Sequence, residues 1–355
     1  MMKFNWSTAA SATSVLKCGS EGDLREVRET LKEWEAPFLV LDSEVNSLWS
    51  EDLQPLIASS SGIYVMEARE VLKNTFTLSQ IWDSMAAAGI TRDTPVVVIG
   101  GGVVCDTGAL AASTYLRGLR LILVPTTLLC MVDACLGGKT GVNLSGAKNQ
   151  VGTFNPAEVV ILCTAFLRTL PDREFRSGMA EVIKTALIGD RELGSMLQGH
   201  EEPGGEELLN VVTRCLAVKG RIVEEDLEDR GSRMVLNMGH TVGHALESCS
   251  GFHLSHGEAV GLGMLAEAAM AVSMGGDRNL PQEIRSLLRN AGLPTETGPD
   301  IPLEELESLL TRDKKSLRSG RIWALPFGWC DCRLVCISSE EEKGILPGIL
   351  RLLKV

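Results

Sequence analysis

The histidines of this chain are concentrated in one short segment and could bind a divalent metal ion. Four of the five histidines, His240, His244, His253 and His256, fall within 17 residues. His240 and His244 are four residues apart, so they share one face if the segment is helical. Glu181, in the apolar stretch Met-Ala-Glu-Val-Ile, is a suitable third ligand, because a buried carboxylate is costly unless it is bound or paired. Two imidazoles and one carboxylate leave open positions on a metal for a substrate.

The pattern over residues 233–248 predicts one continuous helix with a polar stripe. At 3.6 residues per turn, four polar side chains lie within about 60° of one another: Arg233, Asn237, His240 and His244. The spacing is not that of a zinc protease, because Thr241 stands where the HExxH motif requires glutamate. The plainer alternative for the proposed third ligand is a surface ion pair between Glu181 and Lys184.

Glycine-rich segments after two expected strands indicate binding of a nucleotide or a phosphate. Gly100-Gly101-Gly102 follows an apolar run at 95–99, where backbone N–H groups and a helix N-terminus can approach a diphosphate. The spacing differs from GxGxxG, so a plain tight turn is the alternative. Lys139 and Lys148 stand in glycine-flanked segments that we expect to be anion-binding loops, although a surface lysine is ordinarily just solvated.

Short apolar runs alternate with helical patterns in the first half of the chain. Strands are expected at 37–41, 62–66, 95–99, 121–124 and 159–162, with a helix at 77–88, and such alternation predicts a parallel sheet. Helical patterns then dominate, at 178–188, 206–225, 233–248, 258–274 and 282–290, before a strand at 320–326. The sequence therefore predicts an α/β fold. It has a Rossmann-like parallel-sheet domain over 1–170 and a mainly α-helical domain over 171–355, which contains the possible metal ligands.

Composition narrows the class of protein. A formal net charge of -12 argues against a general nucleic-acid binder or a membrane-surface binder, because both partners attract basic faces. We find no apolar run long enough for a membrane span and no secretory signal. Ten cysteines are scattered without a CxxC pair, which predicts free thiols in a reducing cytoplasm.

Together, these segments resemble the 3-dehydroquinate synthase family. The matching stretches, which span roughly residues 95–315, are GGGVVCD, TYLRG, VPTTLLCMVDACLGGKTGVN, GAKNQVGTFNP, LPDREFRSGMAEVIKTALIGD, LNMGHTVGHALE, HGEAVGLGM and RDKK. Each stretch alone is weakly specific, but their order and spacing are highly specific together. The resemblance implies NAD and Zn²⁺ or Co²⁺ as cofactors, an anionic sugar-phosphate substrate and a homodimer. It also implies that the domain over 1–170 binds NAD and that the domain over 171–355 binds the metal and the substrate.

The resemblance also implies roles for individual residues. Glu181, His240 and His256 become the metal ligands, and His244 becomes the proton-transfer residue beside them. Substrate contacts are implied for Lys139, Asn149, Lys184, Lys219, Arg233, Asn237 and one of Lys314 and Lys315, and Arg117 is implied to reach a neighbouring subunit's phosphate site. NAD contacts are implied for Asp42, Glu70, Lys73, Gly101, Gly102, Val103, Val104, Asp106, Thr126, Thr127, Asp133, Lys139, Lys148, Phe166, Leu167, Arg168 and Thr169. Cys105 and Arg69 stand where the family usually has glycine, a departure that concerns NAD contacts.

The implied reaction converts 3-deoxy-D-arabino-heptulosonate 7-phosphate to 3-dehydroquinate and phosphate. It proceeds by transient oxidation with NAD, phosphate elimination, reduction and intramolecular aldol closure. Three alternatives are a cyclase for another sugar phosphate, a metal-dependent glycerol-type dehydrogenase and a non-enzymatic metal-binding protein. The basic residues are excessive for an uncharged polyol, and the complete ligand set argues against a protein that has lost activity.

Overall fold

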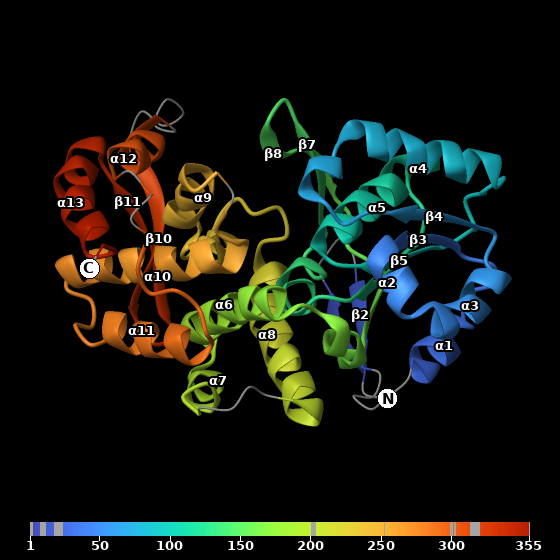
Figure 1. Cartoon of the computed structure of the whole chain (residues 1–355), viewed down its shortest axis with the longest axis horizontal. Helices are drawn as coiled ribbons and strands as arrows, with labels where there is room; N and C mark the ends of the chain where they lie inside the picture. The colour runs from blue at the N-terminus through green and yellow to red at the C-terminus, as the bar shows by residue number, and fades with distance from the viewer. Residues whose placement is uncertain are drawn as a thin grey trace. The chain divides into compact units, whose positions relative to one another are not determined.

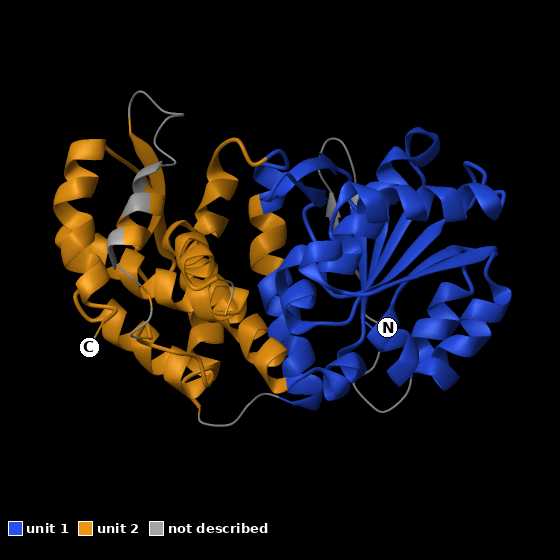
Figure 2. Ribbon diagram, turned by 45° about the horizontal axis from the view of Figure 1, so that its top comes forward, with its two compact units in different colours: residues 1–171, 204–216, 223–228 blue, residues 172–203, 217–222, 229–355 orange. Residues whose placement is uncertain are grey.

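The computed structural model describes residues 3–7, 12–17, 24–199, 204–251, 253–298, 301, 303–312 and 320–354. The chain divides into two compact units (Figure 2). Unit 1 comprises residues 1–171, 204–216 and 223–228, and unit 2 comprises residues 172–203, 217–222 and 229–355. In the part of the chain that is described, no helix is long and apolar enough to cross a membrane.

Unit 1 is built on a seven-stranded sheet. From edge to edge its strands are β1 (Lys3–Ser7), β2 (Ala12–Lys17), β9 (Val159–Leu162), β6 (Leu121–Pro125), β5 (Val96–Gly100), β3 (Phe38–Asp42) and β4 (Gly62–Met66). β1 pairs antiparallel with β2, and the other neighbours pair in parallel. β3, β5, β6 and β9 are buried along their whole length, as expected for strands covered on both faces. The predicted parallel sheet and its five strands are confirmed.

Helices cover both faces of this sheet. In Figure 1, α4 (Thr75–Ala87) and α5 (Gly102–Thr114) lie above strands β3–β5. On the other side lie α1 (Arg25–Leu31), α2 (Ser43–Leu48) and α3 (Ser50–Ser59). α5 begins directly after β5, so the N-terminus of a helix lies at the carboxyl end of a parallel strand, as expected. The long helix α8 (Gly205–Glu225) contributes residues to both units.

The glycine-flanked lysines do not stand in loops. Lys139 begins β7 (Lys139–Leu144), and Lys148 lies in β8 (Ala147–Phe154), which pairs antiparallel with β7. The prediction of two loops is therefore wrong. The glycine before Lys148 serves the tight turn of a hairpin, since Gly146 lies between the two strands with φ of 82°.

Unit 2 is mainly helical, as predicted. Its helices are α6 (Asp172–Gly189), α7 (Arg191–Met196), α9 (His240–Cys249), α10 (His256–Ser273), α11 (Leu280–Asn290), α12 (Leu303–Arg312) and α13 (Ser339–Arg351). An antiparallel pair, β10 (Arg321–Gly328) and β11 (Asp331–Ile337), accompanies them. The strand at 320–326 was expected, whereas its partner β11 was not.

The predicted continuous helix over 233–248 is wrong. A short 3₁₀ helix, η5 (Ser232–Asn237), ends before Met238, and α9 starts at His240. Gly239 between them has φ of 80°, a left-handed conformation that breaks the helical path and that glycine adopts without strain. Arg233 and Asn237 therefore do not share a helical face with His240 and His244.

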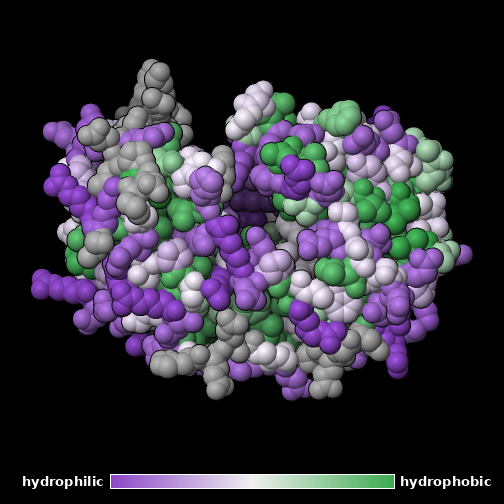
Figure 3. All heavy atoms as spheres, in the orientation of Figure 1, coloured by the Kyte–Doolittle hydropathy of each residue, from purple (hydrophilic) through white to green (hydrophobic). Residues whose placement is uncertain are grey.

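The molecular surface is mixed in polarity. Figure 3 shows hydrophilic side chains over much of the displayed face, with hydrophobic ones in small separate groups. In unit 1 the large exposed hydrophobic side chains include Val71, Phe76, Leu116, Val151 and Phe154.

Candidate active site

Three helices of unit 2 bring the expected metal ligands together. Glu181 lies in the middle of α6, whereas His240 and His256 are the first residues of α9 and α10. Oε1 of Glu181 lies 3.7 Å from Nε2 of His240 and 3.4 Å from Nε2 of His256. Ligands about 2.1 Å from a tetrahedral zinc ion are separated by about 3.4 Å, so this arrangement fits such an ion.

The start of α10 is set by its own sequence. Ser255 and Glu258 form a capping box in which the Ser255 hydroxyl accepts from the Glu258 N–H, and the Glu258 carboxylate accepts from the Ser255 N–H at 2.6 Å. The Gly257 N–H donates to the Ser177 hydroxyl at 2.9 Å and thereby joins α10 to α6. His256 is thus held next to Glu181, at the beginning of a helix that starts two residues before the expected helical pattern over 258–274.

The ion pair between Glu181 and Lys184 is buried, not on the surface. Glu181 is 0% exposed and Lys184 is 2% exposed. A buried charged pair of this kind contributes little net stability, because desolvation offsets the attraction between its members. Because the Glu181–Lys184 pair is buried beside two histidines, a role in a functional site is favoured over a role in stabilising the fold.

The two histidines that we expect to bind a metal have pKa values shifted in opposite directions. Burial, together with the nearby Lys184 charge, lowers the pKa of His240 to about 3, so its ring is neutral. Nδ1 of His240 lies 3.1 Å from the Met238 carbonyl oxygen, which can only accept, so Nε2 is left for a metal. Burial opposes a proton on His256, but hydrogen bonds and charge from Glu181 and Glu247 outweigh it and raise the pKa of His256 to about 9.

Glu247 is a site residue that the sequence interpretation missed. Its Oε1 lies 3.6 Å from Nδ1 of His256, on the opposite side of the ring from Glu181, and the side chain is buried. A carboxylate behind a histidine ligand fixes the orientation of the ring and makes it a stronger ligand. The sequence feature that could have identified Glu247 is its position as an acidic residue among the apolar residues of α9, three residues after His244.

His244 lies beside the expected ligands without being one of the nearest three. It is exposed, and its ring centroid lies 5.3 Å from that of His240 and 6.3 Å from that of His256. His244, Glu247 and His256 also form a group whose ligand atoms lie within 4.8 Å of one another. An exposed imidazole at this position suits proton transfer. His253, the remaining member of the histidine segment, is exposed.

We expect zinc binding by the metal-free protein to release about one proton per ion at pH 7.5 and to strengthen as pH rises. Because the pKa of His256 lies near 9, its proton must leave before the ring can bind a metal. Affinity should therefore increase about tenfold per pH unit below 9 and level off above it. Calorimetry in buffers of different ionisation enthalpy measures the proton count. A count near zero would show that His256 is neutral without metal.

The expected substrate residues of unit 2 differ in exposure. Lys184, Lys219 and Arg233 are buried, with Arg233 on η5 and Lys219 on α8. Asn237, at the end of η5, is exposed. Lys314 and Lys315 lie outside the described residues. Buried cations in the same unit as the ligand cluster would attract an anionic substrate.

The glycine-rich turn of unit 1 leaves room for a ligand at the start of α5. Gly101 is the N-cap of α5 and provides no side chain to cap it. Gly102, Val103, Val104 and Asp106 form the first turns of that helix, so the free N–H groups at its start can meet a phosphate. The Thr126 hydroxyl after β6 is buried and has no hydrogen-bond partner among the described residues. The Thr126 hydroxyl and the uncapped N-terminus of α5 could both donate hydrogen bonds to a dinucleotide, so the residues present fit this type of cofactor.

A hydrogen-bonded network joins expected NAD residues to an expected substrate residue. Nζ of Lys73 donates to Oδ2 of Asp106 and to Oδ1 of Asn149, each at 2.6 Å. Asn143 extends the network, since its Nδ2 donates to Oε1 of Glu70 at 2.8 Å, and its Oδ1 accepts from the Asn149 N–H. Lys73 is buried, so it can hold both neighbours in place.

The other residues expected to contact NAD lie at several places in unit 1. Asp42 ends β3 and caps α2 by accepting from the Glu44 N–H, while burial raises the pKa of its carboxyl. Thr169 accepts from the Trp49 indole N–H, and Arg168 lies over the same ring. Phe166 and Leu167 are buried, so they would offer a cofactor only backbone groups. The remaining positions, half-buried or exposed, are Thr127, Asp133, Lys139 and Lys148.

Arg117 lies in a strained turn. Leu116 has φ of 50° and Arg117 has φ of 71°, and both side chains are exposed. Two consecutive residues other than glycine in the left-handed region make this turn energetically costly.

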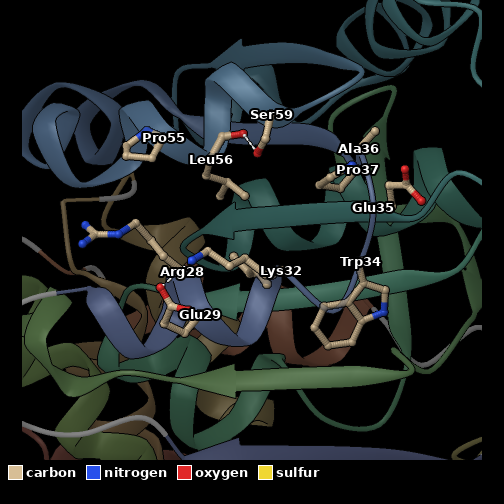
Figure 4. Close-up of a pocket in the computed structure, with 11 residues that line it drawn as sticks. Arg28, Glu29, Lys32, Trp34, Glu35, Ala36, Pro37, Pro55, Leu56 and Ser59 are labelled. Atoms are coloured by element: carbon tan, nitrogen blue, oxygen red, sulfur yellow. Dashed lines mark hydrogen bonds and ion pairs between the residues drawn. The ribbon is translucent and has the colours of Figure 1, made fainter.

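A separate cavity of about 450 Å³ lies between α1 and α3 (Figure 4). Its walls include Trp34, Pro37 and Pro55, none of which belongs to the expected site. Arg28 and Lys32, the basic groups at this cavity, pair with Asp52 and Glu29. These charges are therefore balanced within the unit itself.

Comparison with known proteins agrees with this geometry. Residues 63–177 match the family model for the 3-dehydroquinate synthase N-terminal part, and residues 178–316 match the model for its C-terminal part. The 3-dehydroquinate synthase of Synechococcus sp. strain CC9605 is 41% identical over 289 residues, which are 79% of this chain and 77% of that protein.

Two solved structures share the fold. The 2-epi-5-epi-valiolone synthase of Streptomyces hygroscopicus, with NAD⁺ and Zn²⁺ bound, has a TM-score of 0.82 at 28% identity, covering 95% of this chain and 96% of that one. A 2-deoxy-scyllo-inosose synthase complexed with carbaglucose-6-phosphate, NAD⁺ and Co²⁺ has a TM-score of 0.84 at 24% identity, and the match covers 99% of each chain.

Proposed function

Because this chain belongs to the 3-dehydroquinate synthase family, we propose that it converts 3-deoxy-D-arabino-heptulosonate 7-phosphate to 3-dehydroquinate and phosphate. The observation that carries the proposal is the cluster of the buried Glu181 with the half-buried His240 and His256, with the exposed His244 beside it. The family's reaction needs a metal with open positions and a nearby proton carrier, and this cluster has the residue types for both.

The cofactors of this reaction are NAD and a divalent metal, either Zn²⁺ or Co²⁺. Glu181, His240 and His256 would hold the metal, which when bound polarises substrate oxygens and lowers the pKa of a bound alcohol. The turn at Gly101 and Gly102, with the start of α5, would hold the NAD diphosphate, and NAD supplies transient oxidation. The cofactors named for the two solved relatives support this assignment.

The chain's own residues would then bind the substrate and move its protons. His244 would exchange a proton with the reacting oxygens, since a neutral imidazole accepts and an imidazolium donates near neutral pH. The buried Lys184, Lys219 and Arg233 would bind carboxylate and phosphate oxygens, with exposed Asn237 adding a hydrogen bond. Asn149, fixed by Lys73, would connect substrate binding to the NAD residue Asp106.

Phosphate release is the direct test of this function. The full-length protein would be given the heptulosonate phosphate and catalytic NAD, before and after chelation and zinc restoration, while NADH absorbance is followed. Phosphate release that requires metal, without net NADH, is the expected result. Absence of phosphate release together with NADH build-up on glycerol would replace the proposal with a polyol dehydrogenase. Release from a different sugar phosphate alone would indicate another cyclase.

A homodimer is part of the proposal. Thr153 on β8 donates to the Ser113 hydroxyl at 2.8 Å, which places β8 beside the end of α5 and the strained turn at Arg117. Leu116 of this turn, and Val151 and Phe154 of β8, are exposed hydrophobic side chains. A second copy of this chain would cover them and receive Arg117 at its phosphate site, as the family resemblance implies.

Mixing two inactive variants should restore activity if Arg117 acts across a dimer. Arg117→Ala and His244→Gln homodimers should each be impaired, but a mixed dimer contains one site with both residues intact. Subunit exchange of equal amounts should recover about a quarter of wild-type sites, because half of the dimers are mixed and each has one intact site of two. Phosphate release measures the recovery. No recovery in verified mixed dimers would assign Arg117 to its own subunit's site.

The remaining features of the proposal concern domains and location. We assign the NAD domain to residues 1–170 and the metal- and substrate-binding domain to 171–355, since the expected NAD residues all precede the expected metal ligands in sequence. A cytoplasmic location is supported by the free thiols of the cysteines in the described part of the chain.

A further inference from the structure

The helix that carries His240 and His244 begins without a local cap. Gly239 is the N-cap of α9 and provides no side-chain acceptor, unlike Ser255 at the start of α10. The first N–H groups of a helix require acceptors from outside it, and a buried end cannot rely on solvent. Gly239 and Val242 are buried, so the acceptor must come from another part of the fold.

Glu267 on α10 supplies that acceptor. Its side chain is 0% exposed, and its Oε2 accepts from the Gly239 N–H at 2.5 Å. Burial raises the pKa of Glu267 to about 8, against hydrogen bonds from the N–H groups of Gly239, Val242 and Thr241 that lower it. The carboxyl group therefore lies at the start of α9, where it accepts from the N-cap Gly239 and replaces the missing local cap.

Close packing between α9 and α10 makes this contact possible. A Cβ at Gly263 would lie 1.9 Å from the Gly239 carbonyl oxygen, and a Cβ at Gly239 would lie 2.8 Å from the Val260 carbonyl oxygen. Residue 267 is one turn beyond Gly263 on the same face of α10. A side chain at 267 thus projects from the face of α10 that packs on the start of α9.

We propose that Glu267 is a positioning residue that fixes the start of α9 and thereby aims His240 at the metal. The connection is short, because the capped Gly239 lies between His240 and Met238, whose carbonyl oxygen orients the His240 ring. The inference rests on the proposed metal site of Glu181, His240 and His256. Glu267 belongs to neither group of possible metal ligands in the described part of the chain, and its hydrogen bond is to the backbone of Gly239.

The test measures zinc affinity of the metal-free, full-length protein by competition with a chelator. Glu267→Ala should weaken affinity by about 10- to 100-fold, the range for partners that orient metal ligands. Glu267→Gln should remain within about threefold of wild type, because its amide oxygen can accept the same hydrogen bond. Leu265→Ala is the matched control, since Leu265 is buried on the opposite side of α10.

Hydrogen exchange gives a readout independent of metal. In the metal-free protein, Glu267→Ala should accelerate exchange at the Gly239 amide, which donates to Glu267, whereas Leu265→Ala should not. Unchanged zinc affinity in Glu267→Ala, or an equal loss in Leu265→Ala, would overturn the inference while leaving the proposed function intact. Failure of the wild type to bind zinc would instead overturn the proposed metal site itself, and with it the role of Glu267.

Discussion

Glu181→Gln is expected to lose stoichiometric zinc and to lower kcat by at least about 10³-fold, since a catalytic metal supplies several kcal/mol to the transition state. Glu181 is the ligand that both histidines approach, and its carboxylate is fully buried. A neutral amide there neither binds zinc well nor balances its charge. Zinc content after dialysis and the rate of phosphate release measure the two effects.

The variant also leaves Lys184 buried without its partner Glu181, a change that costs about 3–5 kcal/mol of stability. A double variant, Glu181→Gln with Lys184→Met, should recover most of that stability without regaining zinc. Glu174→Gln is the matched control, because Glu174 is an exposed residue on the same helix. Full zinc occupancy in Glu181→Gln would show that the metal site lies elsewhere.

His244→Gln should lower kcat by about 10²- to 10⁴-fold while zinc content stays at the wild-type level, the range for loss of a general acid or base. His244 is exposed beside His240 and His256, where a ring can exchange protons with solvent and with a metal-bound substrate. The limb of the pH–rate profile that reports its titration should disappear with it.

His253→Gln is the control for this experiment, because His253 is exposed and belongs to neither metal-ligand group of the described residues. It should retain wild-type rates. Loss of zinc from His244→Gln would contradict the assignment of proton transfer. It would indicate instead that the group formed by His244, Glu247 and His256 binds the metal.

Local sequence patterns predicted most of the framework that carries the site. Buried parallel strands need apolar residues on both faces, so β5 and β6 can be predicted from their apolar runs without any knowledge of their partners. The start of α10 at His256 follows from the capping box of Ser255 and Glu258, two residues that are three positions apart in the sequence. The expected ligands Glu181, His240 and His256 were recognised by residue type and by family resemblance, and the fold brings their side chains together.

Tertiary contacts decided what local patterns cannot encode. The break at Gly239 arises because α9 packs against α10 at a distance that leaves no space for a Cβ, whereas helical periodicity alone continued the helix through it. The carboxylate of Glu267 contacts Gly239, which is 28 residues away, and that of Glu247 lies near His256. The roles of both carboxylates can therefore be recognised only once the packing of α9 against α10 is known. Sequence thus determined the strands, the capped helix and the chemical type of each ligand, because these depend on neighbours along the chain. The three-dimensional packing decided which acidic side chains are buried and which histidine has a raised pKa, because both depend on desolvation and on neighbouring charges. It also decided how α9 begins, because the acceptor for its first N–H group comes from another helix.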